Sequence, residues 1–403
     1  MSCVSILKGV VLHGGHGTRL RPLTHGKPKA MLPVANRPVI AHVIDSLLAN
    51  GIRDIVVVVG YRREYVQRFL NGLDIPVRVI VQEKQLGTAH AVRMVEGLVK
   101  GKFVLANGDV LLKADDLKKM LAKDTTAMSL FEAKDTKGLG VVEVVGNKVK
   151  AIHEKVEHPP TNLVNAGVYL LTADIFPAIA KTERSPRGEY ELTESLQILL
   201  GEGHPLSYVK IDRWLNLSYP WDLLTVNESL MGEMEQENLG VIEDNVVMKG
   251  IVSIGKGTVV RANSYIQGPV VIGENCDIGP NCFIRASSAI GDNCHIGGAV
   301  EVKNSIVMRG SKIPHHNYIG DSIIGEGCNL GAGTKIANLR LDKKDISAGN
   351  IDTKRRKFGA IIGDEVQVGI NAGINVGSLI GDHTFIGPGA VVSGVVLPNS
   401  VIL

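Results

Sequence analysis

Short runs of aliphatic, mostly β-branched residues alternate with longer helix-like segments up to about residue 230. These runs are Val10–Leu12, Ile55–Val59, Val77–Val81, Phe103–Ala106 and Val168–Leu171. Continuous apolar runs of this length predict buried strands, and their separation by helical segments is typical of βαβ units. We therefore expect an α/β Rossmann-like domain, with a mostly parallel sheet covered by helices on both faces.

A six-residue period replaces this pattern after the polar, Glu-rich segment 227–238. Aliphatic residues recur at Ile272, Ile278, Ile284, Ile290, Ile296 and Val302. Glycine follows four of them, at Gly273, Gly279, Gly291 and Gly297. Because a short repeat stacks like residues on like, this period predicts a solenoid. It resembles the left-handed parallel β-helix built of hexapeptide repeats.

Small residues and asparagines follow the same period. Cysteine or serine stands four places after the aliphatic position, at Cys276, Cys282, Ser288, Cys294 and Cys328. We interpret these cysteines as fillers of a small inward slot rather than as chemical groups. Asn275, Asn281 and Asn293 share one turn position, where asparagine tolerates left-handed dihedral angles. The spacing of the repeat is expected to slip between Met308 and Ile324.

The chain of 403 residues is too long for one ordinary core. We expect one domain over residues 1–230, a linker over 231–240 and the repeat domain over 241–403. The net charge of +3 is small and favours neither a nucleic acid nor a membrane as partner. Five cysteines without metal-ligand spacing, and a start Met1–Ser5 without signal-peptide character, predict a cytoplasmic protein.

A glycine-rich loop follows the first predicted strand, with the sequence Leu12-His13-Gly14-Gly15-His16-Gly17-Thr18-Arg19. Glycines let backbone N–H groups approach an anion closely. Four cations follow within a short stretch, at Arg19, Arg21, Lys27 and Lys29. This density of positive charge predicts a polyphosphate site, although the spacing is neither that of a P-loop nor GxGxxG.

Two further polar motifs follow predicted strands. Gln82 comes after the third run, and Asn107-Gly108-Asp109 comes after the fourth. Because ligands bind at the carboxyl ends of parallel strands, we expect both motifs to lie at the same edge of the sheet as the glycine-rich loop.

Taken together, these motifs resemble the bifunctional family that joins a sugar-1-phosphate nucleotidylyltransferase domain to a hexapeptide-repeat acyltransferase, known as N-acetylglucosamine-1-phosphate uridylyltransferase/glucosamine-1-phosphate acetyltransferase. The resemblance covers almost the whole chain. The first half is equally similar to glucose-1-phosphate thymidylyltransferases, and the segment 337–340 is similar to archaeal members. The implied substrates are UTP or dTTP, a sugar 1-phosphate and acetyl-CoA, and the implied assembly is a homotrimer.

The resemblance implies roles for residues of the first half. The expected nucleotide-binding residues are Leu12, Gly14, Gly15, Gly17, Thr18, Gln82, Gly87 and Thr88. The expected sugar-binding residues are Gly140, Glu154, Asn165 and Gly167. Arg19 and Lys29 would neutralise phosphate charge during in-line attack on the α-phosphate, and Asp109 would bind Mg²⁺.

Two positions depart from the family pattern. Alanine is usual where His13 stands, and Asp-x-Gly is usual where Asn216-Leu217-Ser218 stands. Because an amide oxygen can also coordinate Mg²⁺, we retain Asn216 as the second metal ligand.

The resemblance also implies an acetyltransferase site in the repeats. Its residues would be Arg285, Lys303, Tyr318, Asn329, Asn338, Lys344 and Lys357, with His315 as the base. Arg285 and Lys303 are eighteen residues apart, so one coil of a three-sided helix would place them side by side. His315 lies two sides further round and would join them only across a subunit boundary or after a slip. His316 stays open as the base, and Lys344 and Lys357 compete for one role.

The sequence thus predicts acetyl transfer to an amino-sugar 1-phosphate, most simply glucosamine 1-phosphate, followed by uridylyl transfer to N-acetylglucosamine 1-phosphate. One alternative is a glucose-1-phosphate thymidylyl- or uridylyltransferase whose β-helix is purely structural. Another is a non-catalytic scaffold that senses sugar nucleotides.

Overall fold

The computed structural model describes residues 7–154 and 158–403, so the expectation for Met1–Ser5 lies outside the described residues. The chain divides into two compact units. The first comprises the described residues up to His16, Pro28–Met31 and Val39–Asn216, and the second comprises Gly17–Lys27, Leu32–Pro38 and Leu217–Leu403. The expected domain boundaries near residues 230 and 240 stay a prediction.

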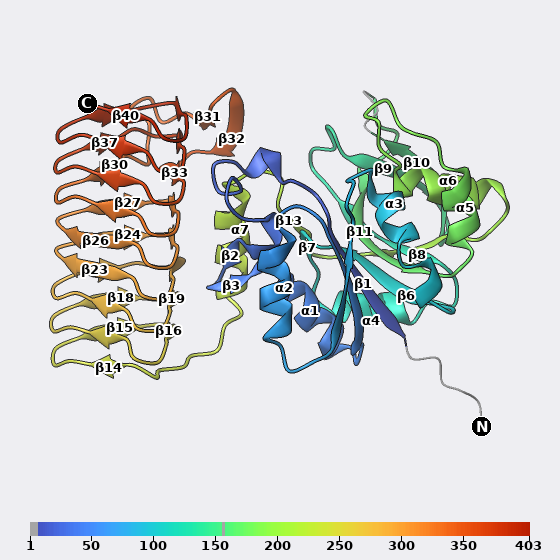
Figure 1. Cartoon of the computed structure of the whole chain (residues 1–403), viewed down its shortest axis with the longest axis horizontal. Helices are drawn as coiled ribbons and strands as arrows, with labels where there is room; N and C mark the ends of the chain where they lie inside the picture. Colours follow the sequence, from blue (N-terminus) through green and yellow to red (C-terminus); the bar gives the residue numbers. More distant parts are fainter. Residues whose placement is uncertain (1–6, 155–157) are drawn as a thin grey trace. The chain divides into compact units, whose positions relative to one another are not determined.

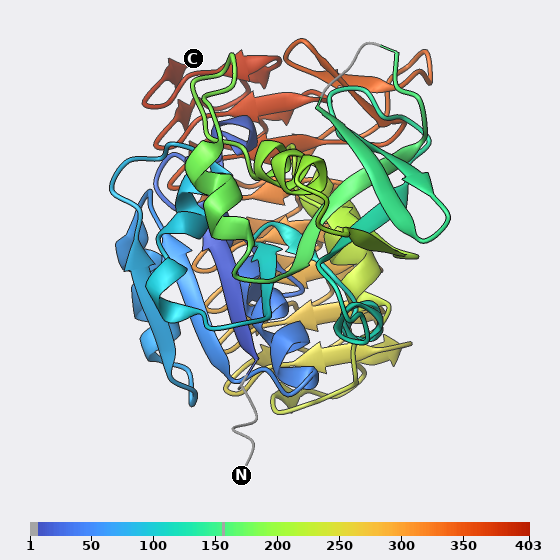
Figure 2. The same cartoon turned by 90° about the vertical axis from the view of Figure 1, so that its right-hand side faces the viewer.

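The first unit is built around a nine-stranded sheet, whose strands lie side by side in Figure 2. In spatial order the strands are β5 (Val77–Val81), β4 (Asp54–Val59), β1 (Lys8–His13), β6 (Phe103–Asn107), β11 (Leu163–Leu171), β8 (Ala127–Glu132), β12 (Ser207–Lys210), β10 (Lys148–Glu154) and β9 (Gly140–Val145). The five apolar runs predicted as strands all lie in this sheet.

The sheet is parallel in one half and mixed in the other. β1 pairs in parallel with β4 and β6, and β4 pairs in parallel with β5. β11 instead runs antiparallel to both β6 and β8. The expectation of a mostly parallel sheet is therefore wrong beyond β6, because the hairpin of β9 and β10 precedes β11, which enters from the opposite end.

Helices cover both faces, as the alternation of apolar side chains requires. Val10 and Leu12 of β1 belong to one core with α3 (Thr88–Arg93), α5 (Ile175–Lys181) and α6 (Leu192–Gly201). Val11 belongs to the opposite core with α1 (Val39–Ala49), α2 (Arg63–Asn71) and α4 (Ala114–Leu121). Since successive strand side chains point to opposite faces, one strand contributes to both cores.

The second unit contains three parallel sheets, from β14 (Val241–Ile242) to β40 (Val401–Ile402), as well as α7 (Asp222–Met231). Successive strands belong to successive sheets, as the yellow-to-red strands of Figure 1 illustrate. For example, β21 (Phe283–Ile284), β24 (Glu301–Lys303), β27 (Tyr318–Gly320) and β30 (Lys335–Ile336) are neighbours in one sheet. This connectivity is consistent with the predicted β-helix.

The repeat positions have the predicted burial and dihedral angles. The aliphatic residues of the six-residue period are buried in one continuous core. Cys276, Cys282, Cys294 and Cys328 are free thiols buried in the same core, which confirms their packing role. Burial raises the pKa of the Cys294 and Cys328 thiols to about 12. Asn275, Asn281 and Asn293 have φ values of 53°, 55° and 57°, as their turn position predicts.

The slip expected between Met308 and Ile324 is confirmed, because the inward residues Ile319 and Ile324 are five rather than six residues apart. A further slip precedes it. Strand β22 (Ser288–Ile290) pairs with β25 (Ile306–Val307) in the register Ile290↔Val307, a step of seventeen residues, whereas Ile272↔Ile290 is a step of eighteen. The shorter coil therefore begins before Met308. The hairpin of β31 (Ile346–Ala348) and β32 (Ile351–Arg355) later interrupts the stack, so that Ile324 pairs with Ile362.

Among the described residues, no helix has the length and apolar character needed to cross a lipid bilayer.

Candidate nucleotide and acetyl-transfer sites

Gly14, Gln82 and Gly60 lie together at the carboxyl edge of the parallel strands. Gly14 follows β1, Gly60 follows β4 and Gln82 follows β5. A Cβ added to Gly14 would overlap Oε1 of Gln82, and one added to Gly60 would overlap the backbone of Gly14. These close approaches require glycine, and they confirm that the loop and Gln82 converge at one edge.

The Gln82 side chain is buried and held by hydrogen bonds. Its Nε2 donates to the carbonyl oxygen of Gly87 over 3.2 Å and lies 2.9 Å from Nδ1 of His90. Gly87 has φ +109°, and a Cβ there would overlap the backbone of Tyr190. The Thr88 hydroxyl accepts a hydrogen bond from the N–H of Leu192 over 3.0 Å, so it anchors the start of α6.

Lys29 and Asp109 form an ion pair of 2.6 Å in the first unit. Although burial opposes it, the Lys29 ammonium holds the pKa of the Asp109 carboxyl below its usual range. A cation and an ionised carboxylate, both partly exposed, are thus available beside the glycine-rich loop.

His13 packs against the motif that contains Asp109. Its ring covers Gly108, where a Cβ would overlap the imidazole. Burial lowers the pKa of His13 to about 4, so the ring is neutral at physiological pH. Within the described part of the chain, its Nε2 is buried without a hydrogen-bond partner.

The structure places Asn216 beside the strand that follows Asp109. β13 (Leu215–Asn216) pairs antiparallel with β7 (Val110–Leu111), and Asn216 is opposite Val110. A carboxylate and an amide are oxygen donors of the kind Mg²⁺ prefers. Within residues 7–154 and 158–403, no group of three or more His, Cys, Asp or Glu side chains is arranged to hold a metal. This donor set fits Mg²⁺, which commonly takes one or two carboxylates and completes its shell with water and substrate phosphates.

The four expected sugar-binding residues fall into two pairs. Glu154 is opposite Gly140 in the β9–β10 pair, and a Cβ added to Gly140 would lie 2.9 Å from Oε1 of Glu154. Asn165 accepts the N–H of Gly167 over 3.1 Å and donates to the Tyr169 hydroxyl over 2.7 Å. Tyr169 was not among the expected residues, and burial raises its pKa well above the usual value.

The segment Gly17–Lys27 belongs to the second unit. Gly17 has φ +62° and precedes the short helix Thr18–Leu20, in which Thr18 and Arg19 are exposed. Lys27 is buried, and its Nζ lies 2.7 Å from Glu326 and 3.0 Å from Asp364 of the same unit. The expectation that Lys27 is one of the phosphate-binding cations is therefore wrong, because its ammonium is buried between two carboxylates and does not reach the surface.

Arg285 and Lys303 stack on neighbouring strands, as their spacing predicts. The register Ile284↔Val302 between β21 and β24 puts the next residues, Arg285 and Lys303, side by side. Arg285 pairs with Glu301 over 2.8 Å, and Lys303 pairs with Asp321 over 2.8 Å.

Asp321 organises the residues around Lys303. Its buried carboxylate also accepts hydrogen bonds from the side-chain amides of Asn304 and Asn338. A Cβ on Gly320 would lie 2.6 Å from the Asn338 amide and 2.7 Å from the Tyr318 hydroxyl. The structure thus brings together the predicted Lys303, Tyr318 and Asn338. Sequence reasoning missed Asp321, although the spacing that linked Arg285 to Lys303 leads to it in one further step.

The other expected acetyltransferase residues lie on other elements of the second unit. His315 ends β26 (Lys312–His315) in the neighbouring sheet, three residues before Tyr318, and both it and His316 are exposed. Asn329 begins β29 (Asn329–Leu330), which pairs with β26. Lys357 forms a backbone bridge with Leu339, next to Asn338, whereas Lys344 lies in the exposed loop before β31. The assignments of His315, Asn329, Lys344 and Lys357 stay predictions.

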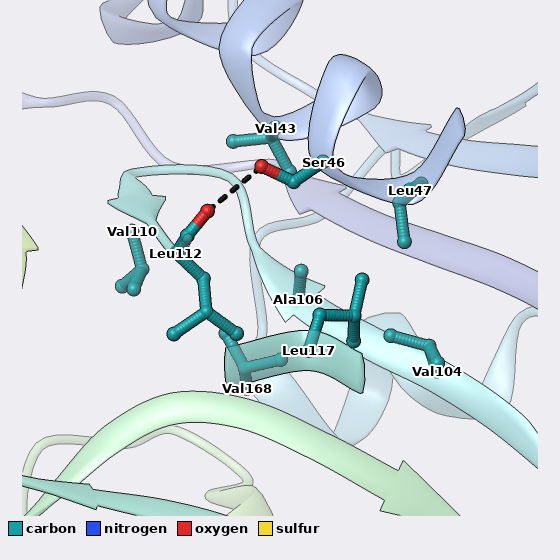
Figure 3. Close-up of a pocket in the computed structure, with 9 residues that line it drawn as sticks. All are labelled: Val43, Ser46, Leu47, Val104, Ala106, Val110, Leu112, Leu117 and Val168. Atoms are coloured by element: carbon teal, nitrogen blue, oxygen red, sulfur yellow. Dashed lines mark hydrogen bonds between the residues drawn. The ribbon is translucent and has the colours of Figure 1, made fainter. Parts of the chain in front are cut away.

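Mostly apolar side chains line a cavity in the first unit (Figure 3). Side chains of α1, α4 and β6 line it, together with Val110, Leu112 and Val168. Ser46 also lines the cavity, and its hydroxyl donates a hydrogen bond to the carbonyl oxygen of Leu112 over 2.7 Å. A cavity of this composition is a packing void rather than a site for a charged ligand.

Comparisons with known proteins match both halves of the chain. A family model described as nucleotidyl transferase matches residues 8–232, and one described as the GMPPB C-terminal domain matches residues 266–372. A UDP-glucose pyrophosphorylase solved with UDP-glucose is similar in fold, with a TM-score of 0.52 and 19% identity, over 57% of this chain and 100% of that chain.

Two curated relatives match almost from end to end. A bifunctional protein GlmU of Methanococcus maripaludis strain C7 is 41% identical over 98% of this chain and 97% of its own. A bifunctional sugar-1-phosphate nucleotidylyltransferase/acetyltransferase of Sulfurisphaera tokodaii is 37% identical over 96% of this chain and 97% of its own. The chain therefore belongs to the family of bifunctional sugar-1-phosphate nucleotidylyltransferase/acetyltransferase enzymes.

Proposed function

We propose that this enzyme acetylates glucosamine 1-phosphate with acetyl-CoA and transfers a uridylyl group from UTP to N-acetylglucosamine 1-phosphate, releasing pyrophosphate. The supporting observation is that each unit has its own arrangement of cations paired with carboxylates. Lys29 and Asp109 form one in the first unit, and the neighbouring pairs Arg285–Glu301 and Lys303–Asp321 form the other in the second. Both substrates of the proposed reactions are anions that such cations bind.

In the nucleotidyl transfer, an oxygen of the sugar phosphate attacks the α-phosphorus of UTP and pyrophosphate leaves. Attacking group and target are both negatively charged, so the reaction depends on positioning and charge neutralisation. Lys29, with the predicted Arg19, would supply positive charge along the triphosphate. Mg²⁺ held by Asp109 and Asn216 would neutralise phosphate charge further.

Gly140, Glu154, Asn165 and Gly167 would bind the sugar. The hydrogen bonds of Asn165 to Gly167 and Tyr169 fix its side-chain amide, so that it meets the sugar hydroxyls without first losing rotamer freedom.

In the acetyl transfer, the amine of the sugar attacks the thioester carbonyl, the C–S bond breaks and the CoA thiolate leaves. Arg285 and Lys303 would hold the sugar phosphate. His315 would take the proton from the attacking amine, a task for which a neutral imidazole is suited. Tyr318 and Asn338 lie together over Gly320 and would orient the substrate.

We further propose that the three-sided coil winds as a left-handed β-helix. We also propose that three copies assemble, because His315 and Asn329 lie on a different sheet from Arg285 and Lys303. In such a trimer, residues of neighbouring copies would complete one acetyltransferase site.

The test crosses four sugar phosphates with UTP and dTTP, with and without acetyl-CoA. The sugars are glucosamine, N-acetylglucosamine, galactosamine and glucose 1-phosphates. Pyrophosphate release measures nucleotidyl transfer, and thiol release measures acetyl transfer. We expect the highest kcat/KM with UTP and N-acetylglucosamine 1-phosphate, and thiol release with glucosamine 1-phosphate.

Other results would contradict the proposal. Preference for glucose 1-phosphate without any thiol release would leave a nucleotidylyltransferase with a structural β-helix. Absence of both products would leave a non-catalytic scaffold.

A further inference from the structure

The buried environment of Gln82 defines which side of its amide is free to meet a base. Nε2 has two hydrogens. One points to the carbonyl oxygen of Gly87 at 3.2 Å, which can only accept, and the other faces Nδ1 of His90 at 2.9 Å. Oε1 lies on the opposite side, against Gly14 of the glycine-rich loop.

The Gly87 carbonyl also determines the tautomer of His90. Because it fixes Nε2 of Gln82 as the donor, Nδ1 of His90 must be an acceptor, and the imidazole proton resides on Nε2 of His90. A hydrogen on Nδ1 of His90 would point at the amide hydrogen of Gln82 and would be repelled by it. Burial and the neighbouring Arg93 lower the pKa of His90, which agrees with a neutral ring.

We infer that His90 is a positioning residue that holds Gln82 with its carbonyl oxygen toward the nucleotide, so that the site accepts bases with an N3–H and rejects cytosine. Uracil and thymine donate a hydrogen from N3 to Oε1. Cytosine presents an unprotonated N3, whose lone pair would face the Oε1 lone pairs. A Gln82 amide turned by 180° would favour cytosine instead, but it would oppose oxygen to the Gly87 carbonyl.

The inference rests on the proposed nucleotidyl transfer, and it goes further by assigning the choice between base classes to a residue that does not contact the base. Failure of the inference leaves the proposed function intact, because the base ratio is measured on an enzyme already shown to release pyrophosphate.

The experiment compares kcat/KM for UTP and CTP in the full-length enzyme with N-acetylglucosamine 1-phosphate, together with the Kd of each nucleotide. His90→Leu removes the acceptor, and we expect the UTP-to-CTP ratio to fall about fivefold, the equivalent of one neutral hydrogen bond. His90→Asn can place Oδ1 at the Nδ1 position, and we expect it to keep most of the ratio. Glu96→Ala, on an exposed residue of the short helix Glu96–Leu98 that follows α3, serves as the control with an unchanged ratio.

A double-mutant cycle separates positioning from general damage. In the Gln82→Ala background, His90→Leu should change the ratio no further, because there is no amide left to orient. An equal effect of His90→Leu in both backgrounds, or an unchanged ratio in the single variant, would overturn the inference.

A measurement on the unmodified enzyme covers the case in which His90→Leu does not fold. Long-range ¹H–¹⁵N spectra report which ring nitrogen has the proton, and His90→Asn assigns the signal. We expect the Nε2–H tautomer, and the Nδ1–H tautomer would refute the inference. An enzyme that releases no pyrophosphate with any nucleotide would reject the proposed function and, with it, this role of His90.

Discussion

Single buried charges have the largest effects at the residue scale. Lys27 illustrates this, since one ammonium is shared by Glu326 and Asp364 inside the second unit. Although burial opposes it, the Lys27 ammonium holds the pKa of the Glu326 carboxyl below its usual range. Removing one partner from such a group leaves buried charge uncompensated, which costs more than the pair itself contributes.

Lys27→Met should therefore lower the free energy of unfolding by about 3 kcal/mol at neutral pH, measured by urea denaturation. The folded pKa of Glu326 is depressed, so its contribution is present above the unfolded pKa and is lost as the pH falls through the folded pKa. The difference between wild type and Lys27→Met should shrink accordingly in acid. A difference that stays constant from pH 7 to acid would contradict this account.

In the acetyl-transfer cluster, Asp321 is likewise a buried charge that is shared by more than one partner. Because it holds Lys303 and Asn338 at once, Asp321→Asn should release the ammonium and misplace the amide. We expect thiol release to fall about tenfold or more, in line with the loss of one charge-assisted hydrogen bond. Asp277→Asn, which breaks a pair with Arg261 on another sheet, is the matched control and should leave thiol release unchanged.

At the scale of elements, the coil depends on turns in the left-handed backbone conformation, which few residues other than glycine and asparagine adopt. Asparagine occupies left-handed positions at the corners of successive coils, including Asn275 with φ 53°. The strands between these corners are only two to four residues long over β20 (Asp277–Ile278) to β26 (Lys312–His315), so each corner directly sets the register of the next strand.

Asn275→Ala should lower stability by about 1 kcal/mol, because alanine in the left-handed region has its Cβ close to the following carbonyl oxygen. Asn275→Gly should cost less, since glycine adopts this conformation freely. The midpoint of urea unfolding, compared among the three proteins, tests the order. Equal midpoints for the alanine and glycine variants would show that the dihedral angle does not limit stability.

At the scale of the whole molecule, the proposed activities should be separable, since their residues belong to different clusters. Asp109→Asn should reduce pyrophosphate release by about a hundredfold, the equivalent of about 3 kcal/mol of charge stabilisation, and leave thiol release intact. His315→Ala should abolish thiol release and leave pyrophosphate release with N-acetylglucosamine 1-phosphate intact. Loss of both activities in His315→Ala would contradict separate sites.

The proposed trimer has its own test. Apolar side chains stay exposed along the last coils, including Val391, Val395 and Leu397, and such surface favours burial against another copy. Sedimentation equilibrium should give the mass of three copies of the 43.2 kDa chain. A monomer that still releases thiol would remove the need for residues from neighbouring copies.

Local patterns determined much of this protein directly. Apolar runs such as Ile55–Val59 form strands, because β-branched side chains favour extended backbone and a sheet covered on both faces removes all of them from water. The six-residue period likewise predicted the buried Ile284 and Ile290, the inward cysteines, and the neighbouring positions of Arg285 and Lys303. The six-residue period and the length of one coil are properties of the sequence, so both can be recognised without the structure.

Contacts between distant segments were decided only by the tertiary structure. Lys27 belongs by sequence to a run of cations near the glycine-rich loop, yet it is buried against Glu326 and Asp364, about three hundred residues away. The antiparallel entry of β11 is of the same kind. The tertiary structure also decided contacts over shorter separations, such as that of His90 with Gln82. A residue type specifies which partners a side chain can accept, whereas packing decides which of them is within hydrogen-bond distance.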